Sequence, residues 1–361
     1  MAKKIYTVIT GSGSYIPSVK VENSHFLSYD FFDPATGEKV DKSNVEIIEK
    51  FKEITNIVER RWIENNQVTS DIAGFAIKDA CQTAGVEPEE LDFIIIGHNF
   101  GDIAFGTVNT DVLPSLANKV KAKLKIKNPD CICHDVISGC PGWTQSMIIA
   151  DSYIRSGVFK RGVVVGADVL SRISDPHDRD SMIYADGAGA VVVEAVKKRR
   201  PVGVLAHASR SDSVKYAGML ELGPSNNPDF NGQKKYIKML GHKLYIYAIR
   251  HVPQIVKKSI EKAGLHLTDI NKVFIHQANE KMDNAMLAGL FKLYKIGKIP
   301  EGIMPMVINK LGNSSSATVP TLFDLVLKGK IEGQSVKSGD NIVFISVGAG
   351  MNINSIVYKV P

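Results

Sequence analysis

The segment Ala76-Ile-Lys-Asp-Ala-Cys-Gln-Thr-Ala-Gly-Val-Glu-Pro-Glu-Glu-Leu-Asp-Phe-Ile-Ile-Ile-Gly-His98 has a second copy later in the chain, Val256-Lys-Lys-Ser-Ile-Glu-Lys-Ala-Gly-Leu-His-Leu-Thr-Asp-Ile-Asn-Lys-Val-Phe-Ile-His-Gln277. Each copy begins with apolar residues at helical spacing and reaches an Ala-Gly pair, which is typical of a helix end. A short polar link then leads into an apolar run of the kind that forms a buried strand. The chain therefore contains a duplicated helix–strand unit.

The repeat continues further along both parts of the chain. A predicted helix over 145–154 is followed by a predicted strand over 163–168, and a predicted helix over 319–327 is followed by a predicted strand over 342–350. Helices that alternate with strands are typical of mostly parallel sheets covered on both faces. The sequence predicts an α/β protein built from two similar halves.

The expected division falls at the basic, proline-marked link Lys197-Lys-Arg-Arg-Pro201, which gives halves 1–197 and 198–361. Ligand sites of parallel sheets lie at the carboxyl ends of the strands. We therefore expect functional residues from both halves to meet in one central crevice.

The composition is that of an ordinary globular protein, with 361 residues, 44% hydrophobic residues, 23% charged residues and a net charge of +6. No apolar run reaches the roughly 18 residues of a membrane span, and the N-terminus lacks the apolar core of a signal peptide. The four cysteines are too few for a disulfide scaffold. We expect a cytoplasmic protein with free thiols and, because basic residues are spread without an aromatic-basic module, no nucleic-acid partner.

Cys140 is the strongest candidate for a catalytic residue. It lies in Asp135-Val-Ile-Ser-Gly-Cys-Pro-Gly-Trp143, where a predicted strand over 132–137 meets the predicted helix over 145–154. Free N–H groups at a helix start favour a thiolate, which is the nucleophilic form of cysteine. A buried structural cysteine is the alternative interpretation.

His276 and Asn313 are candidates from the second half. His276 follows the strand-like Val273-Phe-Ile275, and Asn313 lies in a glycine-containing turn before a predicted helix, as Cys140 does in the first half. Taken singly, they could be a polar strand end and a helix cap. A pseudo-twofold relation between the halves would bring all three side chains together.

Several motifs together resemble the thiolase superfamily, and most closely the β-ketoacyl-acyl-carrier-protein synthase III family of condensing enzymes. The motifs are Gly11-Ser-Gly-Ser-Tyr-Ile-Pro17, the Cys140 turn, Tyr184-Ala-Asp-Gly-Ala-Gly-Ala-Val-Val-Val193, His276-Gln-Ala-Asn279, Gly312-Asn313 and Gly348-Ala-Gly350. The resemblance covers nearly the whole chain. It implies a thiolase fold with layers α-β-α-β-α, a homodimer, and an acyltransferase that initiates fatty-acid biosynthesis with acyl-carrier-protein as partner.

The resemblance also implies roles for individual residues. Cys140 would take up the acyl group from an acyl-CoA or acyl-carrier-protein thioester, and its backbone N–H, with the backbone of Gly348, Ala349 and Gly350, would form the oxyanion hole. His276 and Asn313 would stabilise the enolate formed when a malonyl thioester loses CO₂. Asn279 would orient the end of the strand that carries His276. No cofactor and no metal are expected.

The sequence departs from the family pattern around the substrate entrance. The tryptophan that stacks on the CoA adenine is replaced by Lys50, and only Arg179 remains of that pair. Lys281, with Lys257 and Lys258, is a candidate for binding an acidic carrier protein; a solvated helix face is the alternative.

Three residues are candidates for an unusual acyl pocket, namely Phe100, Phe105 and Val347, the last of which stands where phenylalanine is common. A specialised lipid or polyketide condensing enzyme is therefore an alternative to an enzyme of fatty-acid initiation.

Other function classes fit the residues less well. An acyltransferase to oxygen or nitrogen does not need Asn313, whereas a cysteine thioester hydrolase uses a Cys-His-Asn set without forming a C–C bond. A non-catalytic synthase subunit usually lacks the nucleophile. Gly11-Ser-Gly13 lacks the third glycine of a dinucleotide-binding loop, and Cys131-Ile-Cys133-His134 lacks a second pair of zinc ligands.

Overall fold

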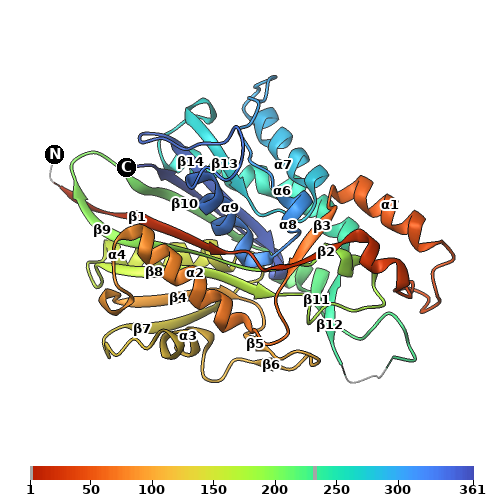
Figure 1. Cartoon of the computed structure of the whole chain (residues 1–361). Coiled ribbons are helices and arrows are strands. Elements are labelled where there is room, and N and C mark those ends of the chain that lie inside the picture. Colours follow the sequence, from red (N-terminus) through yellow and green to blue (C-terminus); the bar gives the residue numbers. More distant parts are fainter. Residues whose placement is uncertain (1–2, 231–233) are drawn as a thin grey trace.

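The first half of the molecule is organised around a five-stranded sheet. The computed structural model describes residues 3–230 and 234–361 (Figure 1). The strand order is β1 (Lys4–Tyr15), β9 (Asp186–Lys198), β8 (Arg161–Val169), β4 (Phe93–His98) and β7 (Ile132–Ile137). The pairs β1–β9 and β9–β8 are antiparallel, whereas β8–β4 and β4–β7 are parallel. β7 therefore forms one edge of this sheet.

The second half repeats this arrangement with one strand fewer. Its order is β10 (Gly203–Ser211), β15 (Asn352–Lys359), β14 (Asn341–Gly348) and β13 (Ile270–Ile275), and only β13–β14 is parallel. Where the first half has β7, the second half has an irregular segment beside β13. The Val273 N–H donates to the Ile303 carbonyl at 2.8 Å, and the Gln277 side chain bonds to the Pro305 carbonyl and the Val307 N–H.

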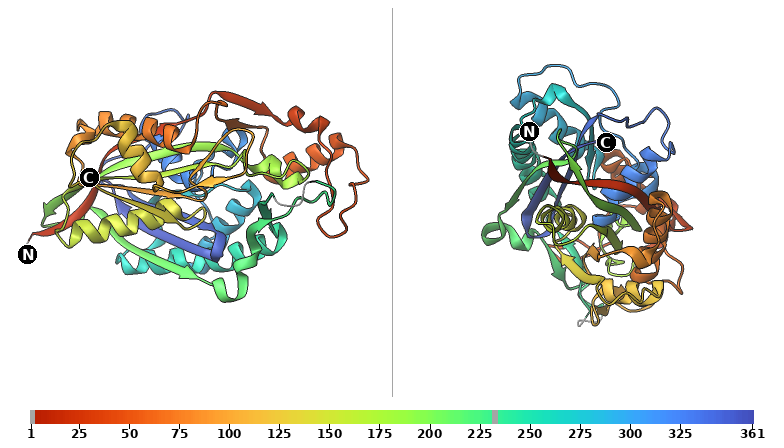
Figure 2. Two further views of the ribbon diagram at one scale, coloured as in Figure 1. Left: turned by 90° about the horizontal axis from the view of Figure 1, so that it is seen from below. Right: turned by 90° about the vertical axis from the view of Figure 1, so that its left-hand side faces the viewer.

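Helices cover both faces of each sheet, which gives five layers (Figure 2). The outer layers are α2 (Thr69–Ala84) with α3 (Leu116–Leu124), and α6 (Gly241–Lys262) with α7 (Glu280–Leu293). The central layer consists of α4 (Gly142–Arg155) and α9 (Thr318–Leu327). The predicted α-β-α-β-α thiolase fold is confirmed.

In the central layer, α9 is buried on all sides and α4 is buried over most of its surface. Every residue of α9 from Thr318 to Val326 is buried, and Trp143 and Met147 of α4 pack with Phe344 and Phe323 in one core. A helix between two sheets is buried over most of its surface, so a high apolar content is expected. Glycine permits the close approach: a Cβ on Gly97 of β4 would lie 2.2 Å from the Gly142 carbonyl carbon.

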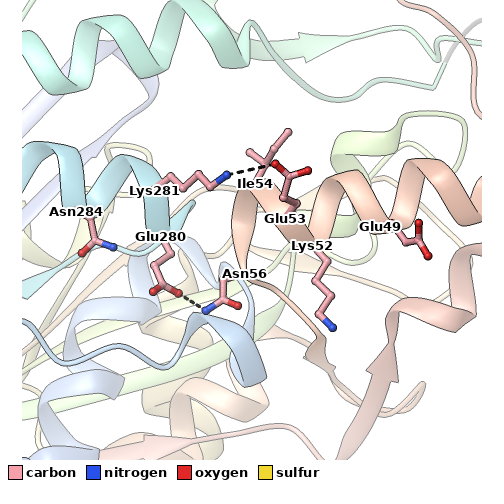
Figure 3. A pocket seen from close by; sticks show the side chains of 8 residues that line it. All are labelled: Glu49, Lys52, Glu53, Ile54, Asn56, Glu280, Lys281 and Asn284. Carbon is pink, nitrogen blue, oxygen red and sulfur yellow. Dashed lines mark hydrogen bonds and ion pairs between the residues drawn. The ribbon is translucent and has the colours of Figure 1, made fainter.

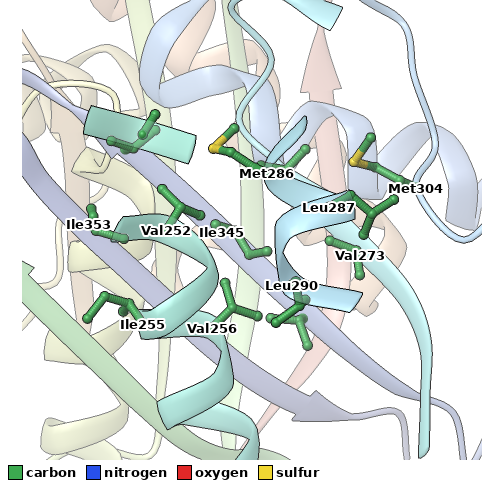
Figure 4. Close-up of a cluster of buried hydrophobic side chains, with 14 of the residues drawn as sticks. Val252, Ile255, Val256, Val273, Met286, Leu287, Leu290, Met304, Ile345 and Ile353 are labelled. Atoms are coloured by element: carbon green, nitrogen blue, oxygen red, sulfur yellow. The ribbon is translucent and has the colours of Figure 1, made fainter. Parts of the chain in front are cut away.

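The outer core of the second half is mostly aliphatic where α6 and α7 pack on β13 and β14. Val252, Val256 and Leu287 face Val273 and Ile345 (Figure 4). Burial of each such side chain contributes roughly 1.5–3 kcal/mol to folding. This packing holds the end of β13, where His276 follows, in a fixed position.

The remaining elements gather at the carboxyl ends of the parallel strands, on the right in Figure 1. They are β2 (Val19–Glu22), α1 (Asn44–Thr55), β3 (Glu59–Trp62), β5 (Asp102–Ile103), β6 (Thr110–Asp111), α5 (Ser213–Tyr216), β11 (Leu220–Gly223), β12 (Tyr236–Met239) and α8 (Ile308–Leu311). Among the described residues, no helix is both long and apolar enough to span a membrane.

The predicted elements differ from the structure mainly at their ends. The helix after Cys140 begins at Gly142 instead of residue 145, and the last predicted strand ends at Gly348 instead of Gly350. A 3₁₀ turn at Ala349–Met351, in which Gly350 has φ 74°, ends that strand.

Candidate active site

A cavity of about 380 Å³ lies where the two halves meet at the carboxyl ends of their strands. Cys140 from the first half and His276 and Asn313 from the second half all line it. Much of the remaining wall is apolar and includes Leu170, Leu220, Ile237, Met239, Leu244 and Met282. The structure therefore brings the three candidate catalytic residues to one cavity.

Cys140 lies in a tight turn between β7 and α4. Gly139 adopts φ 65°, a conformation that glycine accepts without steric cost, and Pro141 is the N-cap of α4. The turn packs directly on the other half, because a Cβ on Gly348 would lie 2.7 Å from the Cys140 nitrogen. The backbone of Gly348, Ala349 and Gly350 lines the cavity beside Cys140, where an oxyanion hole is expected.

The Cys140 thiol is not a preformed thiolate. Burial raises its pKa to about 12, although a hydrogen bond from Ser315 Oγ to Cys140 Sγ at 3.4 Å acts in the opposite direction. The helix start alone had predicted a lowered pKa. That prediction was wrong, because the loss of hydration on burial outweighs the effect of the helix dipole on the thiol pKa.

His276 directly follows β13 and is almost completely enclosed. Its N–H donates to the Ile345 carbonyl at 2.8 Å, and the side chain is 2% exposed. Within the described residues, Nδ1 is buried without a hydrogen-bond partner, so Nε2 is the nitrogen left for a ligand in the cavity. Burial lowers the His276 pKa to about 4, and the imidazole is therefore neutral at pH 7.

Asn313 is fixed by both its backbone and its side chain. Its N–H donates to the Ile183 carbonyl at 3.0 Å, its carbonyl accepts from the Ala185 N–H at 2.9 Å, and its Oδ1 accepts from the Ser315 N–H at 2.8 Å. With the oxygen engaged, the Nδ2 group remains as a donor toward the cavity.

Sequence reasoning missed several polar residues of the cavity wall, among them Asn99, Tyr184 and Ser315. Ser315 could have been found, because it lies two residues after Asn313 in a run of three serines. Asn99 carried no signal beyond its position at the end of a strand.

Two of the three predicted acyl-pocket residues line the cavity, and the third does not. Phe100 and Val347 line the cavity. Phe105 does not: its side chain is 61% exposed and lies beside the Arg172 guanidinium, so it is no part of this chain's own pocket. Asn279 was predicted to orient the end of the strand that carries His276; its side chain instead caps α7, where its Oδ1 accepts from the Met282 N–H at 3.0 Å.

The predicted carrier-binding lysines do not form one patch. Lys281 lies in the first turn of α7, next to Met282 of the cavity, and pairs with Glu53 of α1 at 3.7 Å (Figure 3). A surface groove of about 480 Å³ separates these two helices. Lys257 and Lys258 lie about 20 Å further along α6 from Leu244 of the cavity, so grouping them with Lys281 was wrong.

Arg179 is exposed in the first turn of a 3₁₀ helix, Arg179–Ile183. Its neighbour Asp180 lies close to Gly241, where α6 begins. Within residues 3–230 and 234–361, no three His, Cys, Asp or Glu side chains are grouped to hold a metal ion.

Comparisons with known proteins agree with this arrangement. The family model for 3-oxoacyl-[acyl-carrier-protein] synthase III matches residues 134–213, and the model for its C-terminal part matches residues 260–360. The β-ketoacyl-[acyl-carrier-protein] synthase III of Staphylococcus haemolyticus is 32% identical over 355 residues, which is 97% of this chain and 98% of the relative.

Solved structures of such synthases share the whole fold. The 3-oxoacyl-[acyl-carrier-protein] synthase III of Aquifex aeolicus is 29% identical with a TM-score of 0.78, covering 98% of this chain and 99% of that one. The β-ketoacyl-[acyl-carrier-protein] synthase III of Thermus thermophilus is 26% identical with a TM-score of 0.81 and the same coverage. The chain therefore belongs to the β-ketoacyl-acyl-carrier-protein synthase III family of thiolase-fold condensing enzymes.

Proposed function

We propose that this enzyme joins an acyl group to a malonyl thioester in fatty-acid initiation, using Cys140, His276 and Asn313. The observation that carries the proposal is the single cavity in which a thiol, a neutral imidazole and a carboxamide with a free donor meet. The reaction uses only thioester substrates, so we propose no cofactor and no metal.

In the first step, Cys140 takes the acyl group from a thioester. The sulfur attacks the carbonyl carbon, and the carbonyl oxygen becomes an oxyanion that backbone N–H groups of Cys140 and of the Gly348–Gly350 turn stabilise. The C–S bond to the donor breaks, and the proton of the Cys140 thiol ends on the departing thiol. The products are acyl-Cys140 and free CoA or carrier thiol.

In the second step, the malonyl thioester loses CO₂ and leaves an enolate. The enolate oxygen accepts hydrogen bonds from His276 Nε2–H and Asn313 Nδ2–H, which are stronger to this anion than to the neutral thioester. The enolate carbon attacks the acyl carbonyl, the bond to Cys140 breaks, and the sulfur leaves as a thiolate that takes up one proton from solvent. The product is a β-ketoacyl thioester.

The wall of the cavity favours an apolar acyl group. Phe100, Leu170, Leu220 and Met239 offer no polar atoms to a primer, and Val347 is smaller than the phenylalanine common in the family. A specialised lipid or polyketide pathway would use the same chemistry with a different primer.

An acidic carrier protein is the proposed donor of one or both acyl groups. The Lys281 side chain is 58% exposed and lines the groove between α1 and α7, and the chain carries a net charge of +6. Arg179 is a second exposed cation. Such charges increase the rate of encounter with an acidic partner more than they increase affinity.

We also propose a homodimer formed at the edge strand β7. Exposed apolar side chains gather where β7 and the β5–β6 loop end, with Ile137 64%, Leu113 88% and Phe105 61% exposed. An open edge strand with apolar neighbours favours pairing with a second copy.

Separate measurement of the two half-reactions tests the proposed roles. In Asn313→Ala, we expect acylation of Cys140 to proceed within a few-fold of the wild-type rate, while β-ketoacyl formation falls about 100-fold or more, as for loss of one oxyanion donor. Acylation followed by mass spectrometry and product formation with malonyl-carrier protein give the two rates. Free acid as the main wild-type product would instead indicate a thioester hydrolase.

A further inference from the structure

A series of hydrogen bonds links the Cys140 sulfur to the buried carboxylate of Asp168. Three of its residues lie at or just after the ends of strands of the first half. Asp168 lies near the end of β8, Asn99 directly follows β4, and Cys140 follows β7. These strands are neighbours in the order β8-β4-β7, and their parallel carboxyl ends share one edge of the sheet. Ser315 from the second half completes the chain between Asn99 and Cys140.

Chemistry fixes the direction of each hydrogen bond in this chain. Asp168 accepts from the Asn99 backbone N–H at 2.8 Å, so its carboxylate faces donors. Asn99 Nδ2 donates to Asp168 Oδ2 at 2.8 Å and, with its second hydrogen, to Ser315 Oγ at 2.8 Å. Ser315 Oγ is then an acceptor toward Asn99, and its single hydrogen is left to point at Cys140 Sγ, 3.4 Å away.

The backbone of Ser315 shows that this position is held in place against a local cost. Ser315 has φ 53°, the left-handed region that side-chain-bearing residues seldom adopt. Its N–H donates to Asn313 Oδ1 at 2.8 Å, so the same residue also holds the carboxamide of the enolate site. Strained residues of this kind collect at functional sites, where surrounding contacts outweigh the strain.

We propose that Ser315 is a catalytic residue that stabilises the Cys140 thiolate by a hydrogen bond, and that Asn99, anchored by Asp168, is the positioning residue that directs its hydroxyl. The inference rests on Cys140 as the nucleophile of the proposed function. Burial raises the pKa of the Cys140 thiol, and the helix start alone does not compensate for it. In this proposal, the hydrogen bond from Ser315 lowers that pKa.

Other titratable groups surround the sulfur and set the background for this effect. Asp168 raises the Cys140 pKa through its negative charge, and Cys140 in turn contributes to raising the pKa of the buried Tyr184 hydroxyl. His276, also on the cavity wall, is neutral at pH 7. Within the described residues, Ser315 is the side chain that donates a hydrogen bond to the sulfur.

The test measures the rate of Cys140 alkylation by iodoacetamide from pH 6 to pH 10, with peptide mass spectrometry to follow Cys140 alone. Ser315→Gly removes the hydroxyl and suits the left-handed backbone, so the variant folds without added strain. We expect its pH–rate profile to move to higher pH by about one pKa unit, which lowers the thiolate fraction at pH 8 about tenfold. A more basic thiolate is also more nucleophilic, so the alkylation rate at pH 8 should fall three- to tenfold. Ser314→Ala is the matched control, because the Ser314 hydroxyl contacts Thr318 Oγ1 at 3.4 Å instead of the sulfur.

A double-mutant cycle tests whether Asn99 acts on Cys140 through Ser315. Asn99→Ala should slow alkylation of the wild-type background but add nothing in the Ser315→Gly background, because Asn99 acts through Ser315. An unchanged profile in Ser315→Gly, or an equal shift in Ser314→Ala, would overturn the proposal. An undiminished effect of Asn99→Ala in the Ser315→Gly background would overturn the positioning role of Asn99. Alkylation needs no enolate site, so these outcomes are independent of whether condensation is the reaction.

Discussion

At the scale of residues, the site keeps its two reactive groups uncharged before substrate binds. Burial raises the pKa of Cys140 to about 12 and lowers that of His276 to about 4. Two neutral groups can be buried side by side at far less cost than an ion pair. A neutral His276 can donate a hydrogen bond to the enolate oxygen and keep its proton. A protonated His276 would instead transfer its proton to the more basic enolate.

The lowered His276 pKa predicts an acid-sensitive fold. The unfolded chain binds a proton at His276 near pH 6.5, whereas the folded chain binds it only near pH 4. The unfolded state therefore holds more protons between these values, and stability falls as the pH falls from 6.5 to 4. The contribution lost between pH 7 and pH 4.5 should be about 2 kcal/mol.

Urea unfolding at pH 7 and pH 4.5 measures this contribution. His276→Gln should lose about 2 kcal/mol less than the wild type over the same interval, because other titrating groups are common to both proteins. Equal losses in the two proteins would show that His276 is not held neutral by the fold.

At the scale of elements, two turns from different halves are fitted to each other. The Gly139–Cys140 turn rests on the Gly348–Ala349 turn, and each glycine leaves no space for a Cβ. The sequence predicted the strands and helices on both sides of these turns, because apolar periodicity reports which residues are buried. It could not predict where the turns begin, since the end of β14 depends on contacts with a segment about 200 residues away in the chain.

Gly348→Ala should damage catalysis more than its position in a strand suggests. Its Cβ would lie 2.7 Å from both the Cys140 nitrogen and Pro141 Cδ, so the turn that carries the nucleophile must move. We expect a loss of about 1–3 kcal/mol in stability and a fall of about 100-fold in kcat/KM for acylation.

Gly297→Ala is the matched control, because no atom lies within 4 Å of the added Cβ. It should leave both the melting temperature and the acylation rate nearly unchanged. Wild-type activity in Gly348→Ala would show that the two turns can separate without consequence.

At the scale of the whole molecule, the site lies where the two similar halves meet. It is asymmetric because the second sheet has one strand fewer than the first. Cys140 and Asn313 follow corresponding positions in the two halves, one after β7 and one after the irregular segment beside β13. The sequence was sufficient to predict the fold and the meeting of Cys140, His276 and Asn313, because the repeat fixed their topological positions. It was insufficient for Phe105, Lys257 and Lys258, because loop paths and helix faces depend on packing that periodicity does not report.

The proposed dimer can be tested at the exposed edge of the first sheet. Leu113→Arg places a charge on a side chain that is 88% exposed in the single chain, and it should convert a dimer into a monomer. Leu293→Arg, at the end of α7 in the second half, changes an exposed leucine away from β7 and is the control, which should remain dimeric. Light scattering after gel filtration measures the mass of each variant. A wild-type protein that is monomeric at micromolar concentration would contradict the dimer.

Transfer of an acyl group to the Cys140 sulfur is the event on which the whole account depends. Intact-protein mass spectrometry after incubation with a panel of acyl-CoA and acyl-carrier-protein thioesters measures it directly, and peptide mapping locates the added group. The account predicts one acyl group per chain on Cys140 of the wild type and of Asn313→Ala, and none on Cys140→Ser. An equal acyl adduct on Cys140→Ser, or one located on Cys81, Cys131 or Cys133 of the wild type, would contradict it.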